Sequence, residues 1–318
     1  SAFGVTPAAS DIDGDGATDL VTANIGPKNR LFHNDGFGGF AEVSSETFPP
    51  LAGARVANSA AFGDFDNDGD FDLYVSGGEP RKALFRNDGG GRFSLIPDVE
   101  VPPASNQGLD FCGVVWADFD NDGHLDLLIA NRTDKPSLYR NNGNGTLTRV
   151  YDGPLASQAV GSNGIAVGDY DNDGWLDVLM LNWTYGPPAL YRNAGGTNHW
   201  LKIKPVGTLS NRDGIGVKVR LTTRIGNSRF TQLRQIGGFS SFGTLELNAH
   251  FGLGDASVVE NVSVEWPSGA TTELSNVAAN QTLTITEPET YISVLPPGGL
   301  VTNNVVVTLR TGVKQGVI

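Results

Sequence analysis

The chain spells one acidic pattern, D-x-D-x-D-G-x-x-D, four times: DIDGDGATD at residues 11–19, DFDNDGDFD at 64–72, DFDNDGHLD at 118–126 and DYDNDGWLD at 169–177. The first aspartates of these copies lie 53, 54 and 51 residues apart. Even spacing on this scale marks an internal repeat, in which each copy is one supersecondary unit of the same kind. The repeat therefore decides the architecture of residues 1–200.

Each acidic loop has the same neighbours on both sides. A short apolar stretch comes before it and another after it, as expected for two buried strands joined by the loop. A tag begins 20 or 21 residues after the first aspartate, and it reads LFHN at 31–34, LFRN at 84–87, LYRN at 138–141 and LYRN at 190–193. Gly-rich turns follow each tag. One unit is thus predicted to be strand, loop, strand, turn, strand, turn, strand, which is the four-stranded blade of a β-propeller.

The loops have the composition of a site for a hard cation. Carboxylates at positions 1, 3, 5 and 9 and the backbone carbonyl at position 7 can surround one ion with oxygen. The glycine at position 6 allows the left-handed backbone that folds the loop over the ion. The loops are not EF-hands, because position 12 is Thr22, Val75, Ile129 or Met180 instead of glutamate. The candidate metal ligands are Asp11, Asp13, Asp15, Ala17, Asp19, Asp64, Asp66, Asp68, Asp70, Asp72, Asp118, Asp120, Asp122, His124, Asp126, Asp169, Asp171, Asp173, Trp175 and Asp177.

The distribution of charge strengthens this prediction. The net charge is −13, and sixteen of the 35 acidic residues occupy positions 1, 3, 5 and 9 of the four loops. Carboxylates this crowded repel one another unless a cation lies among them. We therefore predict about four Ca²⁺ ions, one per loop, as part of the fold. Calcium is favoured over magnesium because an almost all-protein oxygen cage suits the larger ion.

With its acidic loops and tags, the chain resembles the FG-GAP or VCBS repeats of integrin α-subunit propellers. The resemblance covers residues 1–200 and implies an all-β fold of propeller blades. Four blades are at the lower limit for a closed ring, so either the ring is incomplete or further blades are too degenerate to recognise. The arginine that recurs in the tag (Arg86, Arg140 and Arg192, with His33 in the first copy) is interpreted as structural because it repeats at one blade position.

A second set of motifs begins where the acidic repeat ends. The segments NRDGIGVKVRL at 211–221, HFGLGD at 250–255 and VEWPSG at 264–269 resemble the ASPIC/UnbV domain of the cartilage acidic protein family. We expect a β-sandwich-like domain over residues 201–287, with residues 288–318 as a linker and the start of a further β-module. His250 and Asp255 are interpreted as parts of a turn rather than a catalytic pair, and Trp266 as core packing.

Several classes of protein are disfavoured by composition. The acidic net charge argues against binding to nucleic acid, whose phosphates require a basic surface. No apolar run approaches the roughly 20 residues that a membrane-spanning helix needs. The single cysteine, Cys112, rules out disulfides within this sequence and is interpreted as a buried small side chain. We expect a secreted or cell-surface protein.

These observations lead to one functional hypothesis with two alternatives. The first is a non-enzymatic, calcium-stabilised scaffold for adhesion or recognition, with an extracellular protein or glycan as its ligand. The first alternative is a carbohydrate-binding propeller, whose candidate aromatics, also interpretable as core residues, are Trp116, Trp175, Trp183, Tyr185 and Trp200. The second is a polysaccharide-active enzyme, although the charged residues outside the repeat form no recognised motif: Glu79, Arg81, Asp110 and Arg132.

Overall fold

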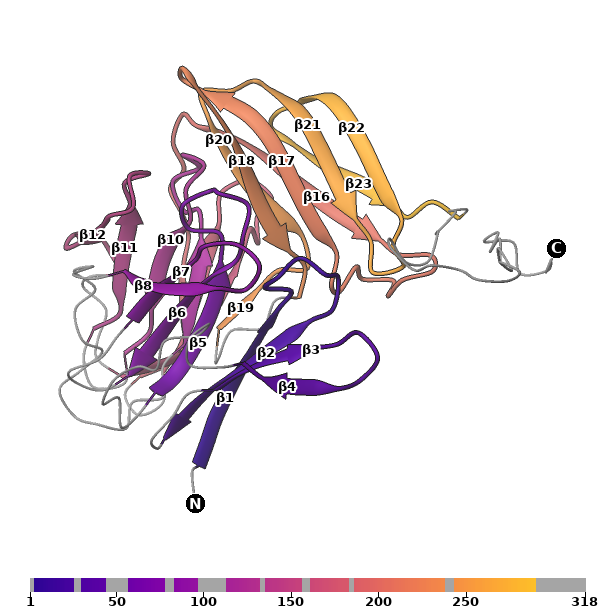
Figure 1. Ribbon diagram of the computed structural model, residues 1–318. Helices are drawn as coiled ribbons and strands as arrows, with labels where there is room; N and C mark the ends of the chain where they lie inside the picture. Colours follow the sequence, from indigo (N-terminus) through magenta and orange to yellow (C-terminus); the bar gives the residue numbers. More distant parts are fainter. Residues whose placement is uncertain are drawn as a thin grey trace, which may run out of the picture.

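The protein is all-β, as its sequence predicts. A computed structural model describes residues 3–25, 30–43, 57–77, 83–96, 113–131, 135–155, 161–182, 186–237 and 243–289, and every regular element in these ranges is a strand. The strands form six small sheets (Figure 1). Within the described ranges no helix qualifies as a membrane span. Cys112 and the further module expected near the end of 288–318 lie outside the described residues.

Three of the sheets are complete four-stranded antiparallel meanders in chain order. The first contains β1 (Phe3–Ser10), β2 (Asp19–Ile25), β3 (Arg30–Asn34) and β4 (Phe40–Glu42). The second contains β5 (Ala57–Gly63), β6 (Asp72–Gly77), β7 (Ala83–Asn87) and β8 (Phe93–Ile96). The third contains β9 (Val114–Ala117), β10 (Asp126–Ile129), β11 (Ser137–Asn141) and β12 (Leu147–Val150). Each therefore has the predicted blade topology, with the acidic loop between the first two strands and the tag on the third.

The fourth sheet departs from this plan at its inner edge. It contains β13 (Ser162–Gly168), β14 (Asp177–Asn182) and β15 (Ala189–Tyr191), and its fourth strand is β19 (Gly243–Leu245), which lies parallel to β13. The strand that follows the fourth tag in sequence, β16 (His199–Val206), instead pairs with strands of the C-terminal domain. This blade is thus completed by a segment that begins 52 residues after the end of β15.

Neighbouring blades pack through apolar side chains between their sheets. β1 and β2 contact β5, β5 contacts β9, and β9 contacts β13. Trp116 is 3% exposed and lies between the second and third blades, with its ring 6.1 Å from that of Phe65 and its Nε1 donating to the carbonyl of Ala61. Trp116 is therefore a core residue and is not available as a sugar platform.

The C-terminal domain is a sandwich of a three-stranded and a four-stranded sheet. The first has the order β20 (Ala249–Gly254), β16, β23 (Gln281–Thr286), and the second has the order β18 (Ser228–Gln235), β17 (Lys218–Ile225), β21 (Val258–Glu265), β22 (Thr271–Ala278). Their inner faces share one core that includes the buried Trp266, as predicted. The sandwich lies against the end of the blades that carries the acidic loops (Figure 1).

Candidate metal centres

The four acidic loops occupy the same place in each blade because the same residues begin and end them. Each loop's first aspartate directly follows the first strand of the blade, and its ninth aspartate is the first residue of the second strand. Position 12 consequently lies within that strand, and strands instead of helices flank each loop, which confirms that these are not EF-hands. The strand pairing brings the two ends of the loop together, since Ser10 pairs with Asp19 and Gly168 with Asp177.

The ninth aspartate is the buried anchor of each loop. In the second loop, Oδ2 of Asp72 accepts the backbone N–H of Phe65 at 2.9 Å, and Oδ1 accepts that of Asn87 at 2.9 Å. The other three loops repeat both bonds at their corresponding positions. Asp72 is fully buried, so its carboxylate holds the loop and the tag strand together without contact with solvent.

The first and fifth aspartates shape the loop around a common centre. Oδ2 of Asp118 accepts the N–H of Gly123 at 2.8 Å, and its Oδ1 accepts that of Asp122 at 3.1 Å. Asp122 in turn accepts the N–H of His124 at 2.9 Å. Position 7 thus contributes its backbone to the loop, which explains why the four loops tolerate Ala17, Asp70, His124 and Trp175 there.

In every loop, at least three carboxylates converge closely enough to bind one ion. Ligand atoms lie within 4.8 Å of one another in the groups Asp11, Asp13, Asp19; Asp64, Asp66, Asp72; Asp118, Asp120, Asp122; and Asp169, Asp171, Asp177. Positions 1 and 3 belong to all four groups, whereas position 9 joins three of them and position 5 joins the third loop's group only. Asp68, Asp126 and Asp173 therefore lie outside the tight groups, and Asp15 belongs to a different one.

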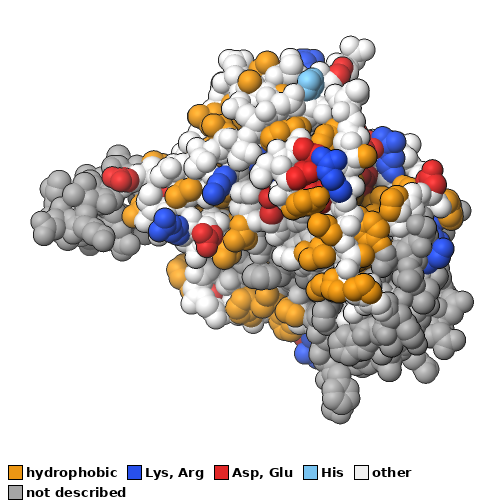
Figure 2. All heavy atoms as spheres, turned by 180° about the vertical axis from the view of Figure 1, so that it is seen from behind, with side chains coloured by type: hydrophobic (Ala, Val, Ile, Leu, Met, Phe, Trp, Pro, Cys, Tyr) orange, Lys and Arg blue, Asp and Glu red, His pale blue; other side chains and the backbone are white. Residues whose placement is uncertain are grey.

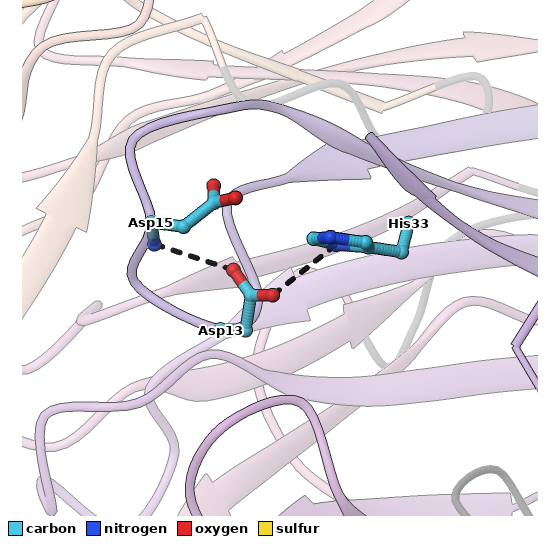
Figure 3. A group of neighbouring side chains, drawn as sticks. All are labelled: Asp13, Asp15 and His33. Carbon is cyan, nitrogen blue, oxygen red and sulfur yellow. Dashed lines mark hydrogen bonds and ion pairs between the residues drawn. The ribbon is translucent and has the colours of Figure 1, made fainter. Parts of the chain in front are cut away.

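That different group contains a histidine that the sequence assigned only a structural role. Asp13, Asp15 and His33 form it, and Figure 3 shows the imidazole of His33 directed at Asp13. Its Nδ1 lies 3.1 Å from Asp13 Oδ2 and 3.1 Å from Asp19 Oδ1. His33 occupies the tag position that is arginine in the other blades, where Arg140 and Arg192 make ion pairs with the aspartates of their own loops.

Burial disfavours the ionised form of these carboxyl groups unless a positive charge lies beside them. Burial raises the pKa of Asp64 to about 7, that of Asp118 to about 8 and that of Asp72 to about 9. The pKa of Asp126 is also raised well above its ordinary value by burial. An ionised carboxylate in such surroundings requires a partner of opposite charge.

The donor set fits a hard cation. Oδ1 of Asp66, at position 3 of the second loop, is buried and has no hydrogen-bond partner among the described residues. Buried polar atoms in proteins are almost always partnered, and an orphaned carboxylate oxygen in a group with two further carboxylates is a place that could hold an ion. Apart from the group that includes His33, the candidate ligands are all carboxylate oxygen atoms, which is the chemistry that Ca²⁺ and Mg²⁺ prefer.

The tag asparagines are functional residues that sequence reasoning missed. Asn141 is 1% exposed, and its Nδ2 donates to the carbonyl of Leu125 at 3.1 Å and to that of Phe65, in the preceding blade's loop, at 2.6 Å. Asn87 and Asn193 make the same two bonds in their blades. The signal in the sequence is the recurrence of asparagine at the end of all four tags.

Asn141→Ala is expected to destabilise the protein by about 2–4 kcal/mol, because it leaves two buried carbonyls without their donor. The neighbouring Asn142→Ala is the matched control, since the side chain of Asn142 is exposed and bonds only to nearby threonines. It should change the free energy of unfolding by less than about 0.5 kcal/mol. Urea denaturation of both variants in calcium buffer measures the difference, and equal stabilities would contradict the role of Asn141 as a link between blades.

Some of the other candidates are described by the structure, and the rest lie outside the described residues. Trp175 is buried against Gly195 and Gly196, which supports its interpretation as core. His250 and Asp255 are not paired: His250 Nε2 lies 3.1 Å from the carbonyl of Gly174, whereas Asp255 accepts the N–H of Gly226. Burial lowers the pKa of His250 to about 4, so it is neutral at pH 7. Trp200 is half-buried, with its ring against Gly174. Six further candidates lie outside the described residues: Glu79, Arg81, Asp110, Arg132, Trp183 and Tyr185.

A groove of about 430 Å³ lies between the third and fourth blades. Its walls combine apolar side chains such as Leu138 and Leu176 with Tyr191 and the two tag arginines, Arg140 and Arg192. Its size is within the range of small-molecule sites. On the face that Figure 2 shows, acidic and basic side chains are intermingled with hydrophobic ones, without a broad basic patch.

Comparison with known families agrees with both halves of the sequence interpretation. A family profile described as FG-GAP-like repeat matches residues 11–75, 74–129 and 118–180. A second profile, described as ASPIC and UnbV, matches residues 207–291. The resemblances drawn from the acidic loops and from HFGLGD and VEWPSG are thereby confirmed.

The chain is also similar to three curated proteins of one name. Cartilage acidic protein 1 of Homo sapiens is 30% identical over an alignment of 300 positions, which covers 85% of this chain and 42% of the relative. The proteins of that name from Mus musculus and Xenopus tropicalis are 30% and 28% identical, and they align with 80% and 88% of this chain and 40% and 44% of their own lengths. The chain therefore spans less than half the length of the curated relatives it matches.

Solved structures give weaker likenesses. An Agrocybe aegerita lectin described as recognising non-reducing terminal N-acetylglucosamine aligns at 17% identity and a TM-score of 0.43, over 86% of this chain and 80% of that one. BBS1N in complex with ARL6DN aligns at 15% identity and a TM-score of 0.35, over 86% of this chain and 69% of that one. Both TM-scores are too low to carry an argument about function.

Proposed function

This chain belongs to the FG-GAP-like repeat family, and on that premise we propose that it is an extracellular recognition scaffold whose four acidic loops each bind one calcium ion. The observation that carries the proposal is the orphaned, buried Oδ1 of Asp66 beside Asp64 and Asp72. Asp66 has a buried oxygen without a partner and belongs to a group whose ligand atoms lie within 4.8 Å of one another, and such a group needs a cation more than it needs a proton donor. The repetition of the same loop in four blades extends the argument to the other three.

Calcium is favoured over other metals by the ligands and by the expected surroundings of the protein. The loops offer only oxygen ligands, apart from His33 in the first, which disfavours metals that select sulfur or nitrogen. Extracellular modules bind calcium with dissociation constants of about 10⁻⁴–10⁻³ M, and such sites fill only where calcium is abundant. When bound, the ions supply charge that lets the buried carboxylates stay ionised, while the protein's own residues set the shape of each loop.

The stoichiometry of bound calcium tests the proposal directly. Native mass spectrometry of protein dialysed against calcium should show about four ions per chain, one per loop. A variant in which Asp64, Asp66 and Asp72 are replaced by asparagine should bind one ion fewer, because it removes the carboxylate group of a single loop. Protein that binds no ion in calcium, with magnesium and zinc as comparison metals, would refute the assignment.

The effect of pH on stability follows from the same buried carboxylates. The pKa values of Asp64, Asp118 and Asp72 in the metal-free fold, about 7, 8 and 9, lie above the ordinary value of 3.8. A raised carboxyl pKa stabilises the metal-free protein fully below the ordinary value, and this contribution is lost as pH rises through the folded values. Calcium removes the loss because the ionised carboxylates are then paired.

The gap between the melting temperatures in calcium and in EGTA is therefore expected to widen as pH rises from about 5.5 to about 8.5. Differential scanning fluorimetry at several pH values, with ionic strength held constant, measures this gap. A gap that stays constant or narrows with rising pH would show that the buried carboxylates are not the calcium ligands.

A scaffold accounts for the described titratable groups better than an enzyme does. Among the described residues, the groups of three or more metal-ligating side chains all lie in the acidic loops or, with His33, beside one. These side chains are engaged in holding the loops, so they are not arranged as a free acid and base around a substrate. We therefore propose a non-enzymatic role in which an extracellular protein or glycan is the partner.

The groove between the third and fourth blades supports a second candidate function, the binding of a carbohydrate or a similar polar ligand. Arginine and tyrosine at its walls can donate hydrogen bonds to hydroxyl groups, and the apolar floor can accept the face of a sugar ring. A glycan array in calcium buffer tests this candidate, with Arg140→Ala as the variant expected to lose binding. Absence of any bound glycan would leave a protein partner as the proposal.

A further inference from the structure

The C-terminal sandwich touches the first aspartate of every acidic loop, and it uses a different strand for each. β17 reaches the first loop, β18 the second, β20 the third and β16 the fourth. The four aspartates, Asp11, Asp64, Asp118 and Asp169, are all between 0 and 6% exposed. One domain therefore covers the same end of all four candidate metal centres.

Lysines make the contact at the first and fourth loops. Lys218 Nζ lies 2.6 Å from Asp11 Oδ2, and Lys202 Nζ lies 2.9 Å from Asp169 Oδ2. Lys202 is 2% exposed, so its ammonium group is removed from water. It is paired with Asp169 and with Glu246, whose Oε1 lies 3.1 Å from Nζ. Buried pairs of this kind are costly to break from either side, because the remaining charge is left without a partner.

Backbone groups make the contact at the second and third loops. The N–H of Leu233 donates to Asp64 Oδ2 at 3.1 Å, and the N–H of Gly254 donates to the carbonyl of Asn121 at 2.8 Å. Gly252 lies so close to the third loop that a Cβ there would stand 2.1 Å from Asp118 Oδ2 and 2.5 Å from the backbone of Asn121. The approach thus requires glycine at this position of β20.

The sandwich also contacts the sixth position of three loops. Arg220 Nη1 donates to the carbonyl of Gly69 at 2.7 Å, and Gly174 accepts from His250. A Cβ on Gly123 would meet Ile225 at 2.7 Å. In the second and fourth loops, this carbonyl and the first aspartate are presented together only when the loop is folded, so the sandwich binds the folded shape of these loops.

We propose that the ASPIC/UnbV domain is a cap that docks on the four loops in their metal-bound shape, so that calcium holds the two domains together. The inference rests on the proposed calcium sites. Emptied loops hold crowded carboxylates that repel one another, and they lose the arrangement that Lys202, Lys218, Leu233 and Gly254 recognise. Coupling of this kind is reciprocal, so weakening the docking lowers calcium affinity by the same factor.

Hydrogen exchange of two backbone amides reports the docking. The amides of Leu233 and Gly254 are bonded across the interface, whereas the amides of β21 and β22 that pair with each other are bonded inside the sandwich. In calcium, peptides containing Leu233 and Gly254 are expected to be protected. In EGTA, their exchange should be at least about tenfold faster, while peptides in β21 and β22 keep their protection.

Two variants separate docking from folding. Lys202→Met in calcium should accelerate exchange at Leu233 and Gly254 by about tenfold and weaken calcium binding in parallel. Lys204→Met is its matched control on the same strand, since Lys204 is exposed and should have no effect. Gly252→Ala places a methyl group against the third loop and should act as Lys202→Met does.

Failure of the cap and failure of the calcium sites would give different results. Four bound ions with unchanged exchange at Leu233 and Gly254 in EGTA would overturn the cap and leave the calcium sites standing. Absence of bound calcium would overturn both. If Gly252→Ala also loses protection in β21 and β22, this substitution has unfolded the sandwich, and the test of docking then rests on Lys202→Met. A Lys202→Met protein whose exchange and calcium binding match those of Lys204→Met would refute the docking role.

Discussion

Chelation of calcium with EGTA is expected to lower the melting temperature of this protein by about 10 °C or more. A site filled at ten times its dissociation constant stabilises the fold by about 1.4 kcal/mol, so four sites together contribute about 5–6 kcal/mol. For a protein region of this size, each kcal/mol corresponds to about 2–4 °C. The effect is large because the ions offset repulsion among carboxylates that are already buried in all four blades.

Differential scanning fluorimetry with matched ionic strength measures this shift. Addition of excess calcium should restore the original melting temperature, whereas the same concentration of magnesium should restore less of it, since magnesium demands a tighter octahedral cage. Equal melting temperatures in calcium and in EGTA would contradict a structural role for the ions, even if calcium were found to bind.

Asp72→Asn is expected to destabilise the protein strongly in calcium and only slightly in EGTA. In calcium, the substitution removes an anchoring ligand of the second loop and should cost about 2–4 kcal/mol, combining the lost ion with a lost hydrogen-bond acceptor. In EGTA, the wild-type carboxyl is buried without a cation, and its pKa is raised to about 9. An amide, which carries no charge, is then no worse than the carboxyl, so the deficit should largely disappear.

Urea denaturation of both proteins in each buffer gives the four free energies that this comparison needs. Asp88→Asn is the matched control, because Asp88 lies in the same blade but is exposed and pairs with Arg86 outside the loop. Its small effect should be the same with and without calcium. A deficit for Asp72→Asn that is equally large in EGTA would assign Asp72 to hydrogen bonding alone.

The blades were predictable because their signals are local. A loop of four aspartates flanked by short apolar runs predicts two antiparallel strands, and the structure has Ser10 paired with Asp19 and Gly63 paired with Asp72 as that predicts. The tag follows at a nearly constant offset, so its place on the third strand was also foreseeable. Periodic spacing predicts these strands because every blade buries the same positions of its repeat.

Features that join distant segments were not predictable in the same way. β19 completes the fourth blade from a position after residue 240, and β16, which follows the fourth tag, joins the sandwich. Neither segment differs in composition from a strand that would have paired locally. Asn141 likewise bonds to a carbonyl 76 residues earlier, a partner that no local pattern specifies.

The sequence alone determined the repeating all-β architecture, the four acidic loops and the identity of the candidate ligands, because these depend on residue type and spacing within about 25 residues. The tertiary structure alone decided which carboxylates converge, that Oδ1 of Asp66 has no hydrogen-bond partner among the described residues, and that a second domain covers all four loops. The reason is physical: burial and charge pairing depend on which surfaces meet in space, and Lys218 meets Asp11 across 207 residues of chain.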